Sequence, residues 1–94
     1  MPTFIMLSTL TDEGAKTIKS NPDRIREVNK EIEKLGATVK AHYAVLGPYD
    51  FVSIVEARDP AAVVRISAEL GSRGSVKLTT MAAIPIDEFI TSIR

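Results

Sequence analysis

The chain has no cysteine, no tryptophan and only one histidine. The missing thiols exclude disulfide bonds, cysteine nucleophiles and zinc sites built from thiolates. A single histidine without cysteine also provides too few ligands for a first-row metal ion within one chain. Glycine-rich phosphate loops and the G-x-S-x-G pattern of hydrolases are missing as well. We therefore expect neither a metal nor a cofactor.

Charge of one sign and long apolar runs are also missing. Acidic and basic residues number 12 each, so the formal net charge is zero. Nucleic-acid binding requires a clustered excess of lysine and arginine, and single-strand binding adds interleaved aromatic residues. No apolar segment approaches the ~18 residues that span a bilayer, and the N-terminus lacks the features of a secretory signal. We expect a soluble cytoplasmic protein that binds neither nucleic acid nor membrane.

What is present is an ordinary globular composition in a short chain. Hydrophobic residues make up 45% of the 94 residues. This length predicts one domain over residues 1–94. A chain of this size buries only roughly 60–65% of the surface of its unfolded form, so its own core is small. Association of subunits would add buried area.

The hydrophobic pattern predicts alternating strands and helices. Pro22 follows Asn21 at a predicted helix start, and Gly36 follows the predicted end of that helix. Asp59 gives a similar cap signal before a second helix. Strands are expected at residues 3–10, 37–46, 51–57 and 76–83, and helices at about 12–20, 22–35 and 60–71, with a short terminal helix within 85–94.

The order β, α, β, β, α, β is typical of the ferredoxin-like fold. In this α+β sandwich two helices cover one face of a four-stranded antiparallel sheet, and the other face is uncovered. The short helix after the first strand and the terminal helix are additions to this pattern.

Strict alternation along the predicted strands indicates which side chains share the uncovered face. In the second strand Lys40 and His42 lie on one side, opposite the more apolar set that contains Val39 and Tyr43. We expect the apolar set to contact the helices, which places Lys40, His42 and Lys77 on the uncovered face beside apolar residues. Such a face usually marks a contact surface and predicts a homo-oligomer. In the alternative, the terminal helix folds back and covers the patch within one chain.

His42 is the one side chain whose ordinary pKa lies near neutrality. As a general base it would need an orienting acid, for which Asp50, Glu56 or an acid of a second subunit are candidates. Tyr49 and Asp50, in the predicted hairpin turn, could contact a ligand. The alternative is that His42 is an ordinary strand residue and that Asp50 only stabilises its turn.

The hairpin sequence Leu46-Gly47-Pro48-Tyr49-Asp50-Phe51-Val52, followed by Ile54-Val55-Glu56-Ala57, resembles the GYD domain family. Further resemblance comes from Leu10-Thr11-Asp12-Glu13-Gly14, from Leu35-Gly36-Ala37 and from Thr79-Thr80-Met81-Ala82, so that it extends over nearly the whole chain. The family tripeptide is interrupted here by Pro48. The resemblance implies a ferredoxin-like fold of the dimeric α/β-barrel type, in a family without a settled biochemical function.

Two functional hypotheses follow from these observations. The first is an oligomeric binding or regulatory module with a small ligand between subunits; its candidate ligand-binding residues are Lys40, His42, Tyr49, Asp50 and Lys77. The second is a small cofactor-free enzyme, similar to a monooxygenase or an isomerase, in which His42 shuttles a proton. A purely structural interaction protein, without any cavity, is a third possibility.

Overall fold

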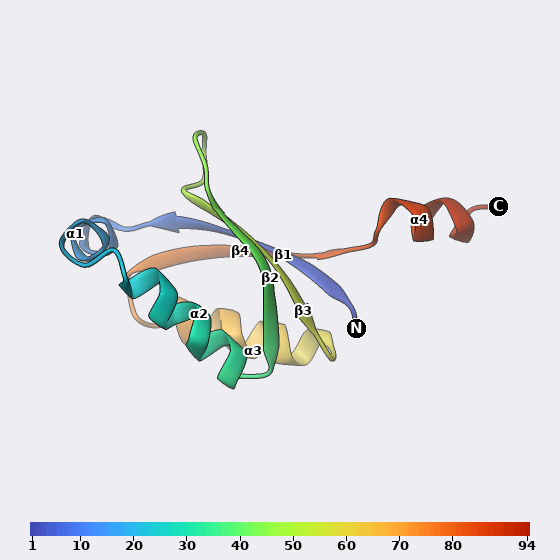
Figure 1. The fold of residues 1–94 in the computed structure, drawn as a ribbon, viewed down its shortest axis with the longest axis horizontal. Coiled ribbons are helices and arrows are strands. Elements are labelled where there is room, and N and C mark those ends of the chain that lie inside the picture. The colour runs from blue at the N-terminus through green and yellow to red at the C-terminus, as the bar shows by residue number, and fades with distance from the viewer.

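A computed structural model describes all 94 residues and shows four strands and four helices (Figure 1). In chain order they are β1 (Thr3–Leu10), α1 (Asp12–Ser20), α2 (Arg24–Lys34), β2 (Ala37–Ala44), β3 (Phe51–Ala57), α3 (Pro60–Gly71), β4 (Val76–Ala83) and α4 (Ile86–Ser92). None of the helices is long and apolar enough to cross a membrane.

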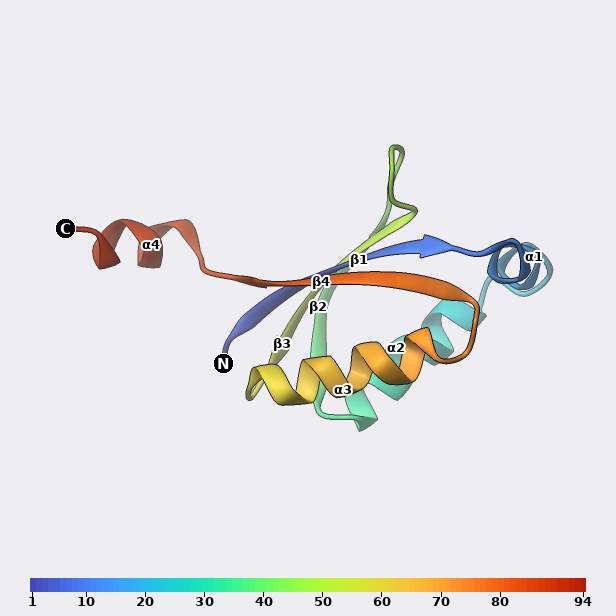
Figure 2. The same ribbon diagram turned by 180° about the vertical axis from the view of Figure 1, so that it is seen from behind.

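The four strands form one antiparallel sheet in the order β2-β3-β1-β4. Helices α2 and α3 lie side by side against one face of this sheet in both views (Figures 1 and 2). This is the ferredoxin-like α+β fold that the element order predicts. The first and third strands are central because each half of the chain contributes one β-α-β unit.

Local signals explain where most elements begin and end. The Thr11 hydroxyl accepts a hydrogen bond from the Gly14 N–H at 3.1 Å, and the Asp59 carboxylate accepts one from the Ala62 N–H at 2.9 Å, so both residues cap their helices. Gly36 has a φ of 108°, a conformation that side chains disfavour, and it turns the chain from α2 into β2.

Two predicted boundaries were wrong. The predicted helix start at Pro22 lies in a turn, in which the Arg24 N–H donates to the Asn21 carbonyl at 3.1 Å, and α2 begins two residues later at Arg24. The second strand ends at Ala44 and not at residue 46: the Val45 N–H still donates to the Asp50 carbonyl at 2.9 Å, but Leu46 is fully exposed in the hairpin loop.

The hydrophobic core lies between the sheet and helices α2 and α3. Its ten buried residues are Phe4, Met6, Ile32, Ala37, Val55, Ala57, Ala62, Val63, Ile66 and Leu70. An ion-pair network closes the outer side of this layer: the Arg73 guanidinium is 2.6 Å from the Glu31 carboxylate, which Arg24 also contacts at 3.2 Å. The hydrogen bond from Arg73 lowers the pKa of Glu31 below its ordinary value.

A β-bulge in β2 overturns the predicted side of His42. Val39 pairs with Val55, but the next paired residue is Ala41, opposite Ile54, so Lys40 is an extra residue in the strand. Beyond the bulge the side-chain alternation is reversed. His42 pairs with the buried Ser53 and therefore faces the helices, whereas Tyr43 points to the uncovered face.

The uncovered face carries two transverse rows of side chains that follow from the strand register. One row consists of Ala41, Ile54, Ile5 and Met81, and the other of Tyr43, Val52, Leu7 and Thr79. No element of the same chain packs over these rows (Figures 1 and 2).

The terminal helix α4 does not cover this face, so the alternative in which it folds back is wrong for this chain. It extends past the end of β4, away from the sheet (Figure 1), and contains no buried residue. Ile86 and Ile93 are each 69% exposed, and Phe89 is 47% exposed. The apolar side of α4 is therefore a second unpartnered surface.

Candidate functional site

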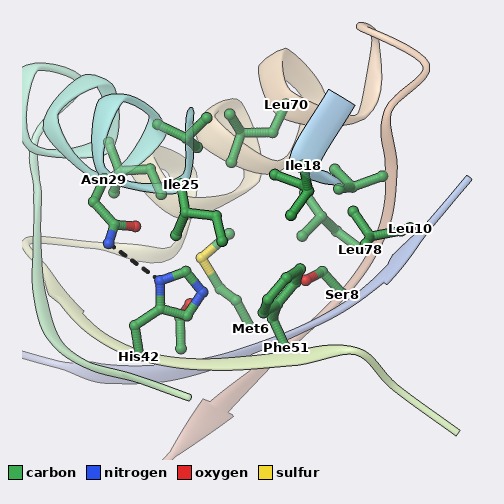
Figure 3. A pocket seen from close by; sticks show the side chains of 14 residues that line it. Met6, Ser8, Leu10, Ile18, Ile25, Asn29, His42, Phe51, Leu70 and Leu78 are labelled. Carbon is green, nitrogen blue, oxygen red and sulfur yellow. Dashed lines mark hydrogen bonds between the residues drawn. The ribbon is translucent and has the colours of Figure 1, made fainter. Parts of the chain in front are cut away.

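A cavity of about 90 Å³ lies between the sheet and the helices α1 and α2 (Figure 3). Ten of its 14 lining residues are hydrophobic. Met6, Ser8 and Leu10 come from β1, and Phe51 comes from the start of β3. Ile18 of α1 lines the cavity together with four residues of α2. Its lining is more hydrophobic than that of the adjoining hollow, in which five of nine residues are hydrophobic.

His42 forms the polar end of this cavity together with Asn29 of α2 (Figure 3). The amide Nδ2 of Asn29 lies 3.1 Å from Nδ1 of His42. Because the amide nitrogen can only donate, His42 Nδ1 must accept, and in the neutral ring the proton therefore resides on Nε2. The sequence hypothesis expected a carboxylate as the partner of this histidine, and the structure places an amide there instead.

Burial lowers the pKa of His42 below its ordinary value of 6.5, because the half-buried imidazole is desolvated and no acid compensates. The ring also makes an edge contact with Phe51, whose centroid is 5.7 Å away. His42 is thus held neutral near pH 7. Glu56, one of its candidate partners, lies on the opposite face of the sheet, opposite Thr38.

The side chain of Asn29 also has a polar atom without a hydrogen-bond partner. Its carbonyl oxygen Oδ1 is buried and has no hydrogen-bond partner. Buried polar atoms are nearly always paired, because an unpaired one has lost its hydration without compensation. Asn29 itself lines the cavity, so a ligand there would lie next to this amide.

Asp50 has a structural role at the end of the sheet. Its carboxylate accepts a hydrogen bond from the Leu10 N–H at 2.8 Å, and its own N–H donates to the Ser8 carbonyl at 2.8 Å. These bonds fasten the hairpin loop to the end of β1. Tyr49 precedes Asp50 in this loop and is half-buried.

Lys40 and Lys77 are not near His42 on the same face. Lys40 sits at the bulge of edge strand β2, where its ammonium is 4.0 Å from the Glu56 carboxylate. Lys77 is exposed on β4, the opposite edge of the sheet. Within one chain the five predicted ligand-binding residues therefore do not converge, and a site that uses all of them remains a prediction about an assembled oligomer.

The residue that sequence reasoning missed is Asn29. It lies four residues after Ile25 and three before Ile32, so helical spacing places it on the same side as the apolar stripe of α2. A polar residue within such a stripe is a signal for a buried polar group. Its partner His42 was hidden by the bulge in β2.

Comparison with known proteins agrees with the fold and the hairpin sequence. The GYD domain matches residues 4–93. The chain belongs to the GYD domain family. A relative in this comparison, from Thermus thermophilus, is named "glutamine synthetase and cystathionine beta-lyase binding protein". It is 58% identical over 95 residues, and the match covers all of both chains.

Solved structures similar to this GYD domain show the same fold. A leucine response regulatory protein from Mycobacterium tuberculosis is 18% identical, with a TM-score of 0.62 over 89% of this chain and 51% of that chain. The protein FFRP-DM1 is 21% identical, with a TM-score of 0.63 over 89% of this chain and 100% of that chain. At these identities the likeness extends to the fold alone.

Proposed function

We propose that this GYD domain is a homo-oligomeric binding module that regulates other proteins, and that a second copy covers the open face of its sheet. The observation that carries the proposal is the pair of apolar rows on that face, centred on Ile5, Ile54, Leu7 and Val52. An exposed apolar sheet face of this kind is typical of a contact surface. A second copy is the favoured occupant because the same chain also presents α4, an apolar helix without a partner.

The partners of the assembled module are proposed from the relative. That protein is named as binding glutamine synthetase and cystathionine beta-lyase, and the match extends over its full length at 58% identity. We propose that this chain binds enzymes of the same two kinds. A cytoplasmic location is part of this proposal, since the module has to share a compartment with its partner enzymes.

The enzyme hypothesis receives less support from the geometry. A proton shuttle needs a group that titrates near the working pH and a partner that orients it. His42 has an amide as its partner, and burial favours its neutral form. These features suit a neutral hydrogen-bonding group better than a base that gains and loses a proton in each cycle.

The decisive variant of the open face is Ile54→Lys. We expect wild type to be a dimer or a larger assembly in native mass spectrometry at micromolar concentration. The introduced lysine would carry an unpaired charge into the interface, and burying one costs about 3 kcal/mol or more, so association should weaken at least about 100-fold. Val64→Lys is the matched control, because Val64 is 67% exposed on α3 and lies away from this face.

The same three proteins are then tested for binding to purified glutamine synthetase and cystathionine beta-lyase by biolayer interferometry. Wild type and Val64→Lys should bind at least one of the two enzymes, and Ile54→Lys should bind less. A monomeric wild type would contradict the association half of the proposal. Absence of binding to both enzymes would contradict the regulatory half, whatever the subunit number.

A further inference from the structure

We infer that the cavity beneath α1 and α2 binds a small, uncharged, mainly apolar molecule that carries one amide or hydroxyl group. The inference goes beyond the proposed association, because the cavity lies on the helix side of the sheet and not on its open face. Three properties of the cavity define this class of ligand: the polarity of its walls, the hydrogen-bonding groups at one end, and the lack of a compensating charge.

Apart from His42 and Asn29, the walls are apolar except for the hydroxyl groups of Ser8 and Ser53. Ile18 of α1 and Ile25 of α2 face Leu10 and Leu78 of the sheet across the space shown in Figure 3. A cavity with such walls gains little from water, because water requires several polar partners at one place. Apolar atoms of a ligand would restore the dispersion contacts that these side chains otherwise lack.

The polar end offers one acceptor and one donor. The acceptor is the buried, unpartnered Oδ1 of Asn29. The donor is Nε2 of His42, which carries the ring proton when Nδ1 accepts from Asn29, and which lies on the cavity side of the ring in Figure 3. An amide or hydroxyl group can donate to the first and accept from the second.

The ligand must be uncharged. His42 is the one ionisable residue among the 14 that line the cavity, and it is held neutral by burial. Arg24 and Arg73 line an adjoining hollow, but both are already paired with Glu31. A carboxylate or an ammonium group would therefore lose its hydration without a counter-charge, which is costly.

Size and access limit the ligand further. An apolar cavity of about 150 Å³ holds benzene, so one of about 90 Å³ encloses roughly four non-hydrogen atoms, and a ligand of about six would extend into the surface hollow at its mouth. Entry is from the β2 side, where Ile25, Asn29, His42 and Phe51 also line a shallower surface hollow next to Tyr43.

Isobutyramide and isobutyrate are matched probes, since they have nearly the same shape and differ in charge. Each is titrated into the ¹⁵N-labelled full-length protein at pH 7.5 and followed by NMR. For isobutyramide we expect saturable shifts at the cavity residues with a Kd on the order of 1 mM, as for a fragment of six heavy atoms. Nuclear Overhauser contacts should connect its methyl groups with Ile25 and Phe51. Isobutyrate should bind at least about ten-fold more weakly, because its charge must be desolvated.

Asn29→Leu tests the polar end, because leucine has the same branched shape and number of side-chain heavy atoms as asparagine but no acceptor. It should weaken isobutyramide binding about ten-fold, the effect of losing one hydrogen bond of about 1.4 kcal/mol. Asn21→Leu, an exposed change at the end of α1, should leave it unchanged. The inference is overturned if isobutyramide gives no saturable shifts, if isobutyrate binds equally well, or if Asn29→Leu binds as wild type does. Should Asn29→Leu fail to fold, the two probes on wild type still decide.

Discussion

At the scale of single residues, the extra residue Lys40 determines what His42 can do. Strict alternation would leave His42 on the open face with Lys40. The bulge at Lys40 turns His42 towards α2, where Asn29 holds its Nδ1 and Phe51 contacts its ring. The imidazole consequently exchanges solvent for a mostly apolar setting, which disfavours its charged form.

The pKa of His42 should therefore be below 6.5 in the folded protein. In the unfolded chain the pKa returns to the ordinary value, so below pH 6.5 the unfolded state binds more protons. The contribution of His42 to the free energy of unfolding is complete above pH 6.5 and is lost as the pH falls towards its folded pKa. NMR titration of the ring protons gives the pKa, and urea unfolding at pH 7.5 and 5.5 gives the stability.

His42→Gln is the control for this linkage, because glutamine retains hydrogen-bonding groups and does not titrate. Its free energy of unfolding should fall less than that of wild type between pH 7.5 and pH 5.5. Glu31 does not affect this comparison. Its pKa in the folded protein is below 4.5, so its protonation changes the free energy of unfolding only below about pH 4.5. A His42 pKa above 6.5, or equal pH slopes for the two proteins, would contradict the burial argument.

At the scale of elements, close packing of α1 against the start of β4 supports one wall of the cavity. Gly14, in the first turn of α1, is buried, and a side chain there would overlap the backbone carbonyl of Ser75. The Thr11 N–H donates to that same carbonyl at 3.0 Å, and the Thr11 hydroxyl donates to the Gly74 carbonyl at 2.7 Å. Glycine is therefore needed at position 14 because α1 lies so close to the backbone of Ser75, and not because of the φ and ψ angles of Gly14.

Gly14→Ala should destabilise the fold by about 2 kcal/mol, because the methyl group must push α1 away from β4. Gly71→Ala provides the matched control. Gly71 also lies in a helix, at the end of α3, but a methyl group there meets open space. That change should be neutral or stabilise by up to about 1 kcal/mol, as expected for alanine over glycine in a helix. Chemical denaturation measures both, and equal effects at the two positions would exclude the packing explanation.

At the scale of the whole molecule, the chain is extended for its length. Its radius of gyration is 14.0 Å, whereas a compact domain of this size has about 12 Å. Its longest dimension is 50 Å, along which α4 projects beyond the sheet. An isolated helix of seven residues is not stable in water, because nucleation is costly. In the assembled protein α4 should therefore pack on a neighbouring copy.

Phe89→Glu should weaken self-association at least about ten-fold and leave the fold of the separate chain intact. Phe89 is half-exposed within one chain, so its replacement removes few contacts there, and the free energy of unfolding should change by less than about 0.5 kcal/mol. Thr91→Glu, on the polar side of α4, is the control for charge. Sedimentation velocity measures association. If both variants associate as wild type does, α4 is not part of the interface.

Local signals in the amino-acid sequence were enough to predict the ferredoxin-like topology. Element order, the cap at Asp59 and the glycine at residue 36 act through backbone geometry, which depends little on distant residues. The hairpin sequence around Tyr49 and Asp50 similarly indicated the GYD family, which the match over residues 4–93 confirmed.

Which functional side chains lie close together, in contrast, depends on tertiary packing. One inserted residue in β2 reversed the side of His42, and alternation rules cannot detect a bulge because its position depends on pairing with β3. The cavity depends on how α1 and α2 settle against the sheet, and the partner of Asp50 is a backbone amide 40 residues away. These contacts join residues far apart in the chain, so they are fixed by packing and not by any local pattern.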